Sequence, residues 1–351
     1  MDKKKELAVR ILVPILITCG IFLYLRLANS DGNGVPKTDE IYSFNIAYEV
    51  YNEEIIYLDN PSYENTPNKL LIRDADGKVS ECGIENVDAF AVDGQYVYAQ
   101  CIENTLCMFD LENKTMKHTW SFGHEAFKGV DLKDFSGLKL MCADSKGAYF
   151  VADDGKGIGI YQATPSGKLN DIIVFPNMAG DIDRMTISEN YLAFGYDGNE
   201  VDSGTYVYDF NKHSVERVST LVGEEETELL PTFFWEDYYL IPFDYDLHMI
   251  SLNSNENKQV DIPYAHMNMC LDENWLYSGS YTGLYKYNLK TGEVKMHKDY
   301  SRCVGTMKVY DNNLYLGYVA ENEDGTREPK FIVKPLKSFM WDDDSYNIFE
   351  N

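Results

Sequence analysis

The stretch Asp272-Glu273-Asn274-Trp275-Leu276-Tyr277 decides the fold, because its pattern recurs along the chain. A polar turn leads into an apolar strand, and Asp311-Asn312-Asn313-Leu314-Tyr315-Leu316 has the same order. Seven such strands align when one residue of each is placed in register: Tyr57, Tyr98, Phe150, Ala193, Leu240, Tyr277 and Leu316. Successive members of this set are separated by 41, 52, 43, 47, 37 and 39 residues. Strand repeats of this length are typical of the blades of a β-propeller.

Each repeat predicts further strands around its marker strand. A second strand follows after about ten to seventeen residues, marked by Ile72, Phe109, Tyr161, Tyr208, Ile250, Tyr287 and Val333. Its alternating apolar pattern suits a pleated surface packed on both sides. An inner strand precedes each marker strand, at Phe44–Val50, Ala89–Val92, Leu138–Cys142, Met185–Ile187, Thr232–Trp235, Met267–Leu271 and Thr306–Tyr310. A weaker outer strand, such as Val215–Ser219 or Val294–His297, completes each unit.

These patterns predict an all-β, seven-bladed propeller of four-stranded antiparallel blades over residues 41–345, with a tail at 346–351. A composition of 44% hydrophobic residues supports a globular core. The last blade needs a partner strand, which either Glu40–Phe44 or Leu336–Trp341 can supply as its outer strand. Outside the first thirty residues, a short stretch at His124–Phe135 is the one helical candidate.

The N-terminal thirty residues predict a transmembrane or signal helix. Lys3, Lys4, Lys5 and Arg10 precede the uncharged run Ile11–Leu25, and Arg26 follows it. Three alternatives remain open for this segment. It is an uncleaved membrane anchor, a cleaved signal peptide ending near Ala28-Asn29-Ser30, or a lipoprotein signal at Leu16-Ile17-Thr18-Cys19-Gly20. The positive-inside rule places the propeller outside the cytoplasm in every case. We therefore expect a single-pass cell-membrane protein, with a secreted protein or a lipoprotein as the alternative.

Residues 31–40 are predicted to form a flexible linker between this segment and the propeller. The whole chain has a formal net charge of −26, with 31 basic and 57 acidic residues. Residues 1–30 hold five basic and two acidic residues, so the remainder has 26 basic and 55 acidic residues and a net charge of −29. This balance excludes nucleic acid as a favourable partner and disfavours anionic lipid head groups.

Cysteine, histidine and glycine patterns identify no established catalytic or transition-metal motif. No Cys-x-x-Cys pair, HExxH pair, nucleotide-binding glycine loop or GxSxG elbow occurs. Cys101 and Cys107 flank a tight connection, so a cross-strand disulfide and two small buried hydrophobic side chains are both open. Enzyme activity stays undecided, because propeller enzymes assemble sites from distant residues.

Loop lengths point to one face of the ring. The connections between second and third strands and between blades are long, at Asp59–Lys69, Gly195–Thr205, Val319–Lys330 and His124–Gly137. Such loops on a rigid scaffold usually carry binding function. This face is predicted to bind a protein or a small ligand.

The same face is predicted to be acidic on two adjacent blades. Its candidate metal ligands are Asp197, Glu200, Asp202, Asp244 and Asp246, with Glu224, Glu225, Glu226 and Glu228 in the connecting link. Carboxylates in this number suit Ca²⁺ or a cationic partner, whereas a solvated acidic rim is the alternative. Tyr63, Tyr196 and Tyr245 lie in the same loops and could stack on a sugar or peptide, or pack locally.

The phrase Asn274-Trp275-Leu276-Tyr277-Ser278-Gly279, followed by Gly283-Leu284-Tyr285-Lys286-Tyr287, resembles repeats of the YWTD-like and PQQ-like propeller superfamilies, including bacterial membrane-anchored members. The resemblance covers residues 41–341 at the level of the repeat pattern. The strict YWTD tetrapeptide and the regular tryptophans of quinoprotein dehydrogenases are missing, with four tryptophans in the chain. The resemblance therefore implies no quinone cofactor and carries over no site residue.

The sequence thus predicts an extracytoplasmic, membrane-tethered propeller that acts as a binding module. The alternative is a secreted glycan-active lyase or hydrolase with a site over the central channel. Convergent polar residues with perturbed pKa values at the channel would favour the enzyme. A broad acidic or aromatic loop face would favour the binding module.

Overall fold

The computed structural model describes residues 41–43, 46–59, 68–101, 104–122, 138–153, 158–175, 181–197, 203–219, 231–243, 245–254, 256–263, 269–280, 283–297, 306–321 and 326–342. The predicted anchor between Ile11 and Leu25, the linker, the helical candidate His124–Phe135 and the tail at 346–351 lie outside these ranges. Within the described ranges, no helix is long and apolar enough to cross a membrane.

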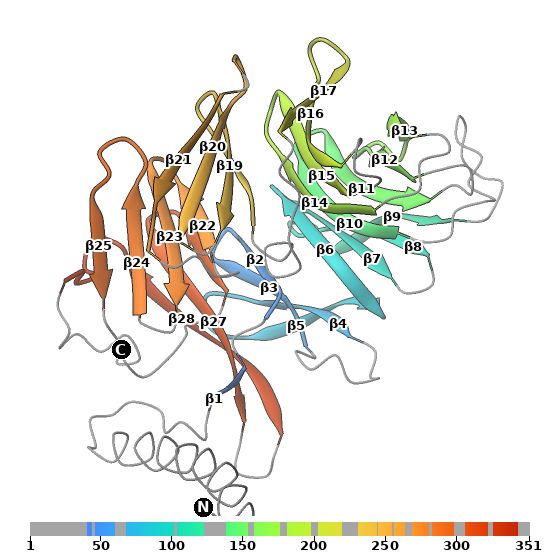
Figure 1. Cartoon of the computed structure of the whole chain (residues 1–351). Coiled ribbons are helices and arrows are strands. Elements are labelled where there is room, and N and C mark those ends of the chain that lie inside the picture. Colours follow the sequence, from blue (N-terminus) through green and yellow to red (C-terminus); the bar gives the residue numbers. More distant parts are fainter. Residues whose placement is uncertain are drawn as a thin grey trace, which may run out of the picture.

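Within these described ranges, twenty-eight strands form seven antiparallel sheets, each of four strands. Figure 1 shows their arrangement. Blade one contains β2 (Tyr48–Tyr51), β3 (Glu54–Leu58), β4 (Lys69–Arg73) and β5 (Val79–Glu85). Blade two contains β6 (Val87–Asp93), β7 (Tyr96–Cys101), β8 (Thr105–Asp110) and β9 (Thr115–Ser121). Blade three contains β10 (Leu138–Asp144), β11 (Gly147–Asp153), β12 (Ile158–Ala163) and β13 (Leu169–Val174).

The remaining blades repeat this order. Blade four contains β14 (Asp181–Ile187), β15 (Tyr191–Asp197), β16 (Gly204–Asp209) and β17 (Ser214–Ser219). Blade five contains β18 (Phe233–Trp235), β19 (Tyr238–Phe243), β20 (Asp246–Ser251) and β21 (Asn257–Asp261). Blade six contains β22 (Met269–Asp272), β23 (Trp275–Ser280), β24 (Gly283–Asn288) and β25 (Val294–His297). Blade seven contains β26 (Met307–Tyr310), β27 (Asn313–Glu321) and β28 (Arg327–Pro335), joined by β1 (Ile41–Ser43).

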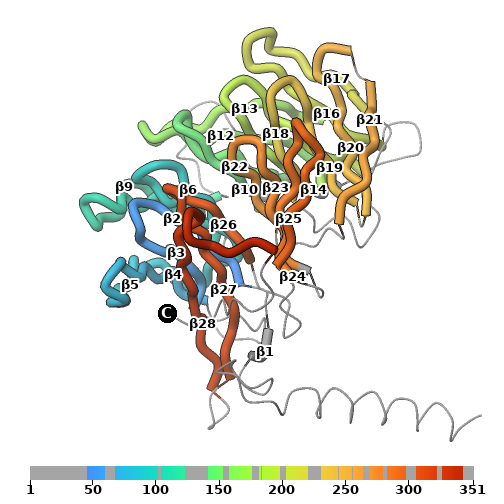
Figure 2. The backbone as a smooth tube through the Cα atoms, turned by 90° about the vertical axis from the view of Figure 1, so that its left-hand side faces the viewer, coloured from blue at the N-terminus to red at the C-terminus, as the bar shows by residue number. Residues whose placement is uncertain are grey.

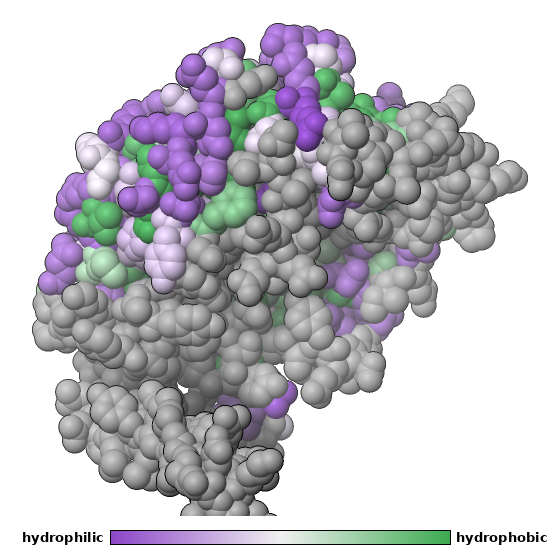
Figure 3. Space-filling model, viewed as in Figure 1, coloured by the Kyte–Doolittle hydropathy of each residue, from purple (hydrophilic) through white to green (hydrophobic). Residues whose placement is uncertain are grey.

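The seven marker residues of the sequence repeat each lie on the second strand of a blade. All seven are buried, with exposed fractions between 0% and 6%. Apolar side chains on both sides of each sheet form seven clusters, and each cluster joins one pair of neighbouring blades. The outer surface seen in Figure 3 over blades five and six is mainly hydrophilic, as expected once the apolar side chains lie between blades. The predicted all-β propeller with seven four-stranded blades is confirmed.

Blade seven differs from the prediction in the position of its fourth strand. β1 pairs with β27, Ile41 opposite Ala320 and Ser43 opposite Val319. Because β28 pairs along the whole of β27, β1 occupies the other edge, beyond the end of β26. The predicted outer strand from Glu40–Phe44 is therefore wrong in position, since its described part, Ile41–Ser43, extends the inner edge.

Residues Leu336–Trp341 do not supply that outer strand either. They form turns and cross to blade six, where the Asp342 N–H donates to the Met296 carbonyl at 2.7 Å. Phe339 is buried beside His297, with 5.8 Å between the ring centroids. The C-terminal segment thus joins blades six and seven through side chains rather than through a strand.

The outer edge of β28 has no partner strand within the described residues, and two prolines protect it. The Leu336 N–H donates to the Asn312 carbonyl at 2.8 Å, which fixes the alternation of the β27–β28 hydrogen bonds. Pro329 and Pro335 then fall at positions whose backbone points away from β27. Proline lacks an N–H, so this edge is a poor template for an added strand.

The ring closes between blades seven and one. The Tyr48 hydroxyl lies 2.6 Å from the Thr306 carbonyl oxygen and 2.9 Å from that of Tyr315. The Thr306 hydroxyl donates to the Ile46 carbonyl at 2.6 Å. A Cβ atom at Gly317 would lie 2.7 Å from Cε1 of Tyr48, so glycine is required for this close approach. Blade one is thereby held against blade seven by hydrogen bonds as well as apolar packing.

The short turns after the third strands repeat one capping arrangement. Asp110 Oδ1 accepts the N–H groups of Glu112 at 3.0 Å and Asn113 at 2.9 Å. Asp209 and Asn288 hold the equivalent turns of blades four and six through the same pattern of side-chain oxygen to backbone N–H. Such contacts stabilise a turn locally. The acidic residues at these turns are therefore used to build the fold.

We expect Asp110→Asn to lower the free energy of unfolding in a pH-dependent way. Burial opposes ionisation of Asp110, but hydrogen bonds from Asn113 and the ion pair with Lys117 hold its pKa at about 2. Because the pKa of Asp110 is lower in the folded chain than its ordinary value of 3.8, the ionised carboxylate stabilises the fold above pH 3.8. This stabilisation is lost as the pH falls toward 2. The loss should be about 2 kcal/mol at neutral pH. Urea unfolding at pH 7, 4 and 2.5 measures it, and a deficit that is independent of pH would contradict the assignment.

We expect Tyr48→Phe to lower the free energy of unfolding by about 1 kcal/mol, because the variant loses the hydroxyl contacts that close the ring. Tyr98→Phe is the matched control, since its buried hydroxyl has no hydrogen-bond partner among the described residues. The control should be as stable as the parent chain or slightly more so. Thermal unfolding of both variants tests this, and equal losses would show that Tyr48 has no special role in closure.

Candidate functional site

The two faces of the ring differ in their connections. The turns between first and second strands and between third and fourth strands are short, and we call their side the short-turn face. The connections between second and third strands and between blades lie on the opposite side, the long-loop face. Asp197 ends β15 on the long-loop face of blade four, and Asp246 begins β20 on that of blade five.

Aspartates lie opposite one another at the long-loop ends of both blades. Asp181 is paired with Asp197 across β14 and β15, and Asp246 with Asp261 across β20 and β21. Asp197 accepts a hydrogen bond from the Ser203 hydroxyl at 3.2 Å and is exposed, as is Asp261. Within the described part of the chain, Asp197, Asp246 and Asp261 have no ion-pair partner. The like charges of Asp246 and Asp261, opposite one another across β20 and β21, repel one another, so this position favours a cation from outside the fold.

The predicted metal site is only partly visible. Of its five residues, Asp197 and Asp246 are described, whereas Glu200, Asp202 and Asp244 lie outside the described residues, as do Glu224, Glu225, Glu226 and Glu228. Among the described side chains, no group of three or more His, Cys, Asp or Glu is arranged to hold a metal ion. The Ca²⁺ site therefore stays a prediction.

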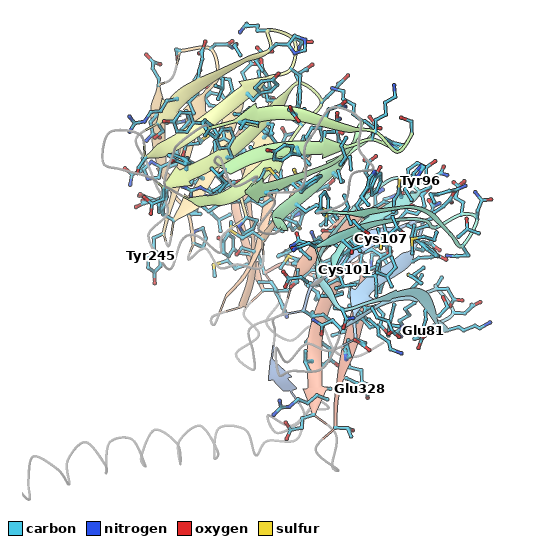
Figure 4. The ribbon with its side chains drawn as sticks, turned by 90° about the vertical axis from the view of Figure 1, so that its right-hand side faces the viewer. Glu81, Tyr96, Cys101, Cys107, Tyr245 and Glu328 are labelled. Atoms are coloured by element: carbon cyan, nitrogen blue, oxygen red, sulfur yellow. The ribbon has the colours of Figure 1, made fainter. Side chains whose placement is uncertain are left out.

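The tyrosines predicted on this face separate into different roles. Tyr196 is 2% exposed and its ring stacks on Phe175 at 5.6 Å between centroids, so it belongs to the core. Tyr245 is 63% exposed and projects from the ring in Figure 4. Tyr63 lies outside the described residues. Tyr245 is thus the described aromatic side chain of this set that is exposed.

A polar cluster that sequence reasoning missed lies on the short-turn face between blades two and three. Burial raises the pKa of Asp93, and the nearby carboxylate of Asp144 raises it further. Burial also raises the pKa of Asp144, against hydrogen bonds from the backbone of Lys146 and Gly147. The buried Tyr98 hydroxyl lies near both carboxyl groups, which contribute with burial to raising its pKa.

These two aspartates come from the tips of β6 and β10, on adjacent inner strands. Their side chains could exchange a proton closer to neutral pH than ordinary carboxyl groups. The sequence signal was weak, because every blade carries polar residues at this turn. For the alternative function of a lyase or hydrolase, Asp93 and Asp144 are the candidate acid–base groups.

The cysteines of the described residues are free thiols. Cys101 and Cys107 face the same apolar cluster between blades one and two, and each is 8% exposed. Figure 4 shows both residues on blade two. A hydrogen bond from the Cys101 thiol outweighs burial and lowers the pKa of Cys107 to about 7. The structure therefore contains Cys101 and Cys107 as two buried thiols and not as a disulfide.

We expect alkylation of Cys107 to rise with a midpoint near pH 7, because the thiolate is the reactive form. Cys82, whose pKa burial raises to about 12, is the internal control and should stay unreactive. Iodoacetamide labelling from pH 6 to 9, followed by peptide mass spectrometry, measures both sites. Cys101→Ala should shift the Cys107 midpoint upward, and an unchanged midpoint would contradict the thiol–thiol contact.

Blade seven also contradicts the predicted loop Val319–Lys330. β27 continues to Glu321 and β28 begins at Arg327, so most of this segment is strand. Both strands have nine residues, whereas the second and third strands of the other blades have five to seven. Figures 1 and 2 show this hairpin reaching beyond the ring, and Figure 1 shows β1 beside it. The alternation Tyr315, Gly317, Val319 was the signal for the longer strand.

No family model matches the chain, and no curated protein matches it. Solved structures resemble it in fold. An oligogalacturonate lyase from Vibrio parahaemolyticus has a TM-score of 0.54 and 11% identity, covering 85% of this chain and 92% of that one. BamB from Moraxella catarrhalis has a TM-score of 0.45 and 14% identity, covering 88% and 85% of the two chains. The CNH domain of AfRom2 has a TM-score of 0.48 and 10% identity, covering 83% and 97%.

Identities this low show the fold alone. The resemblances to the PQQ-like and YWTD-like superfamilies therefore remain predictions.

Proposed function

We propose that this chain is a membrane-tethered, extracytoplasmic binding module whose long-loop face binds a cationic partner. The N-terminal segment with Ile11–Leu25 at its centre provides the anchor, and the propeller is the rigid binding body. The observation that carries this proposal is the placement of aspartates opposite one another at the long-loop ends of blades four and five.

Two features of the charge distribution support a cationic partner. The chain beyond residue 30 carries 26 basic and 55 acidic residues. On the short-turn face, Asp110 and Asp209 are bound to Lys117 and Lys212 and to backbone N–H groups. On the long-loop face, Asp197, Asp246 and Asp261 have no such partner within the described residues. These three carboxylates are thus available for an incoming cation on the face with the long loops.

The exposed ring of Tyr245 adds an aromatic contact beside Asp246. A lysine or arginine side chain gains from an aromatic face as well as from a carboxylate. A basic peptide segment fits both groups, whereas Ca²⁺ uses the carboxylates alone. The proposal therefore favours a basic segment of a protein, with Ca²⁺ as a competing ligand for the same oxygens.

We expect the full chain in mild detergent to bind a fluorescent hexalysine peptide, more weakly as salt is raised. Asp197→Ala combined with Asp246→Ala should weaken binding by about tenfold, which corresponds to about 1.4 kcal/mol. Asp76→Ala combined with Asp237→Ala is the matched control, since it removes the same charge from exposed short-turn positions. Fluorescence anisotropy measures all three proteins, with Ca²⁺ as a competitor. Equal weakening by both double variants would show that net charge alone attracts the peptide.

A second candidate is a glycan-active lyase or hydrolase. Its support is the likeness in fold to the oligogalacturonate lyase and the raised pKa values of Asp93 and Asp144. Incubation with oligogalacturonate, followed by ultraviolet absorbance of an unsaturated product, tests the lyase. Product formation that Asp144→Asn abolishes would favour the enzyme over the binding module.

A further inference from the structure

The hairpin of blade seven forms a stem on the long-loop face. We define the stem as residues 318–321 of β27, residues 327–330 of β28 and β1 (Ile41–Ser43). The Gly317 N–H of β27 donates to the Thr306 carbonyl at 3.0 Å, just before β26 begins at Met307. Beyond that point β1 takes over the edge of β27, at Val319 and Ala320. The stem is therefore a three-stranded extension that the other blades lack in the described residues.

The stem is anchored firmly at its root. Val319 has no exposed surface and packs in the cluster that joins blades seven and one. The Phe331 ring, directly below the stem, contacts Tyr48 and Tyr57 with centroids 5.3 and 5.1 Å away. A rigid root means that the direction of the stem is fixed relative to the ring.

The chain enters the ring through this stem. β1 begins at Ile41, and fifteen residues separate it from Leu25, the end of the uncharged N-terminal run. A flexible linker of this length has a root-mean-square span of about 20 Å. The two faces of a blade are separated by the length of a strand, which is also about 20 Å for six residues. A linker of this span, attached at β1, therefore favours a membrane beside the long-loop face over one beside the short-turn face.

The charges of the stem also differ from those of the ring. Arg327 forms an ion pair with Glu321 at 3.1 Å, and Lys330 forms one with Glu328. The charges of these four residues sum to zero. Figure 4 shows Glu328 on the hairpin that extends from the ring. The connection between the two strands adds Glu323 and Asp324, so residues 318–330 carry a net charge of −2, against −29 for residues 31–351 as a whole. Anionic head groups therefore repel the hairpin only weakly.

We propose that the stem holds the propeller with its long-loop face turned toward the membrane and its short-turn face turned away. This inference rests on the proposed membrane tether. It assigns the acidic face of blades four and five to the space next to the bilayer, so that the basic partner of that face is reached at the membrane surface.

Energy transfer to lipids tests the orientation on the full chain. An azide-bearing phenylalanine is introduced in place of Thr326 or Tyr245 on the long-loop face, and in place of Asp76 or Asn113 on the short-turn face. Each variant is labelled with one donor dye and reconstituted into phosphatidylcholine vesicles that contain rhodamine-labelled lipid. Transfer from Thr326 and Tyr245 should exceed that from Asp76 and Asn113 by roughly twofold or more, since about 20 Å separates the faces.

Flotation of the same vesicles separates the two proposals. Chains that fail to float with the vesicles overturn the tether itself. Chains that float but show equal transfer from both faces, or more from the short-turn face, overturn the orientation and leave the tether intact. A flexible insert of about twenty residues between Thr38 and Asp39 is the matched control and should reduce the difference between faces. A difference that survives the insert would contradict the role of the short connection to the stem.

Discussion

The packing of each blade on its neighbours is the constraint on which the whole structure depends. A four-stranded sheet with apolar side chains on both faces cannot be stable alone, and seven apolar clusters between seven blades solve the problem only if the ring closes. The last interface joins residues far apart in sequence, with Tyr48 separated by 258 and 267 residues from its two acceptors. Ordering so long a loop costs entropy, which the hydrogen bonds around Tyr48 and the close contact at Gly317 help to offset.

Closure by an inner-edge strand has consequences for the rest of blade seven. Most blades end in an outer strand that follows a short turn, but β28 leads instead into the segment that packs on blade six. The Lys286 ammonium lies 5.1 Å from the ring centroid of Trp341 and 4.3 Å from that of Trp275. Burial lowers the pKa of Lys286, because removal from water disfavours the charged ammonium. The outer edge of β28 then needs another form of protection, and Pro329 and Pro335 provide it.

The sequence was sufficient for the blades because strand periodicity and turn chemistry are local. Tyr277 and its six counterparts were placed in register by alternation alone, and the structure buries all of them. The same alternation cannot say which edge of a strand a distant segment will join, so the position of β1 was missed. Tyr196 was assigned to the loop Gly195–Thr205, although it continues the pattern of β15. The pair Asp93 and Asp144 was missed because its proximity depends on how two blades pack.

The acidic composition and the proposed orientation have a common physical consequence. An anionic bilayer repels the ring over a Debye length of about 8 Å at physiological ionic strength, which is shorter than the linker span of about 20 Å. In the proposed arrangement the ring therefore stands off the membrane, and the gap is bounded by negative charge on both sides. Small anions and nucleic acid are excluded from such a gap, while a basic segment is attracted by the bilayer and by Asp197 and Asp246 together. Tethering would then raise the local concentration of precisely those partners whose charge the long-loop face fits.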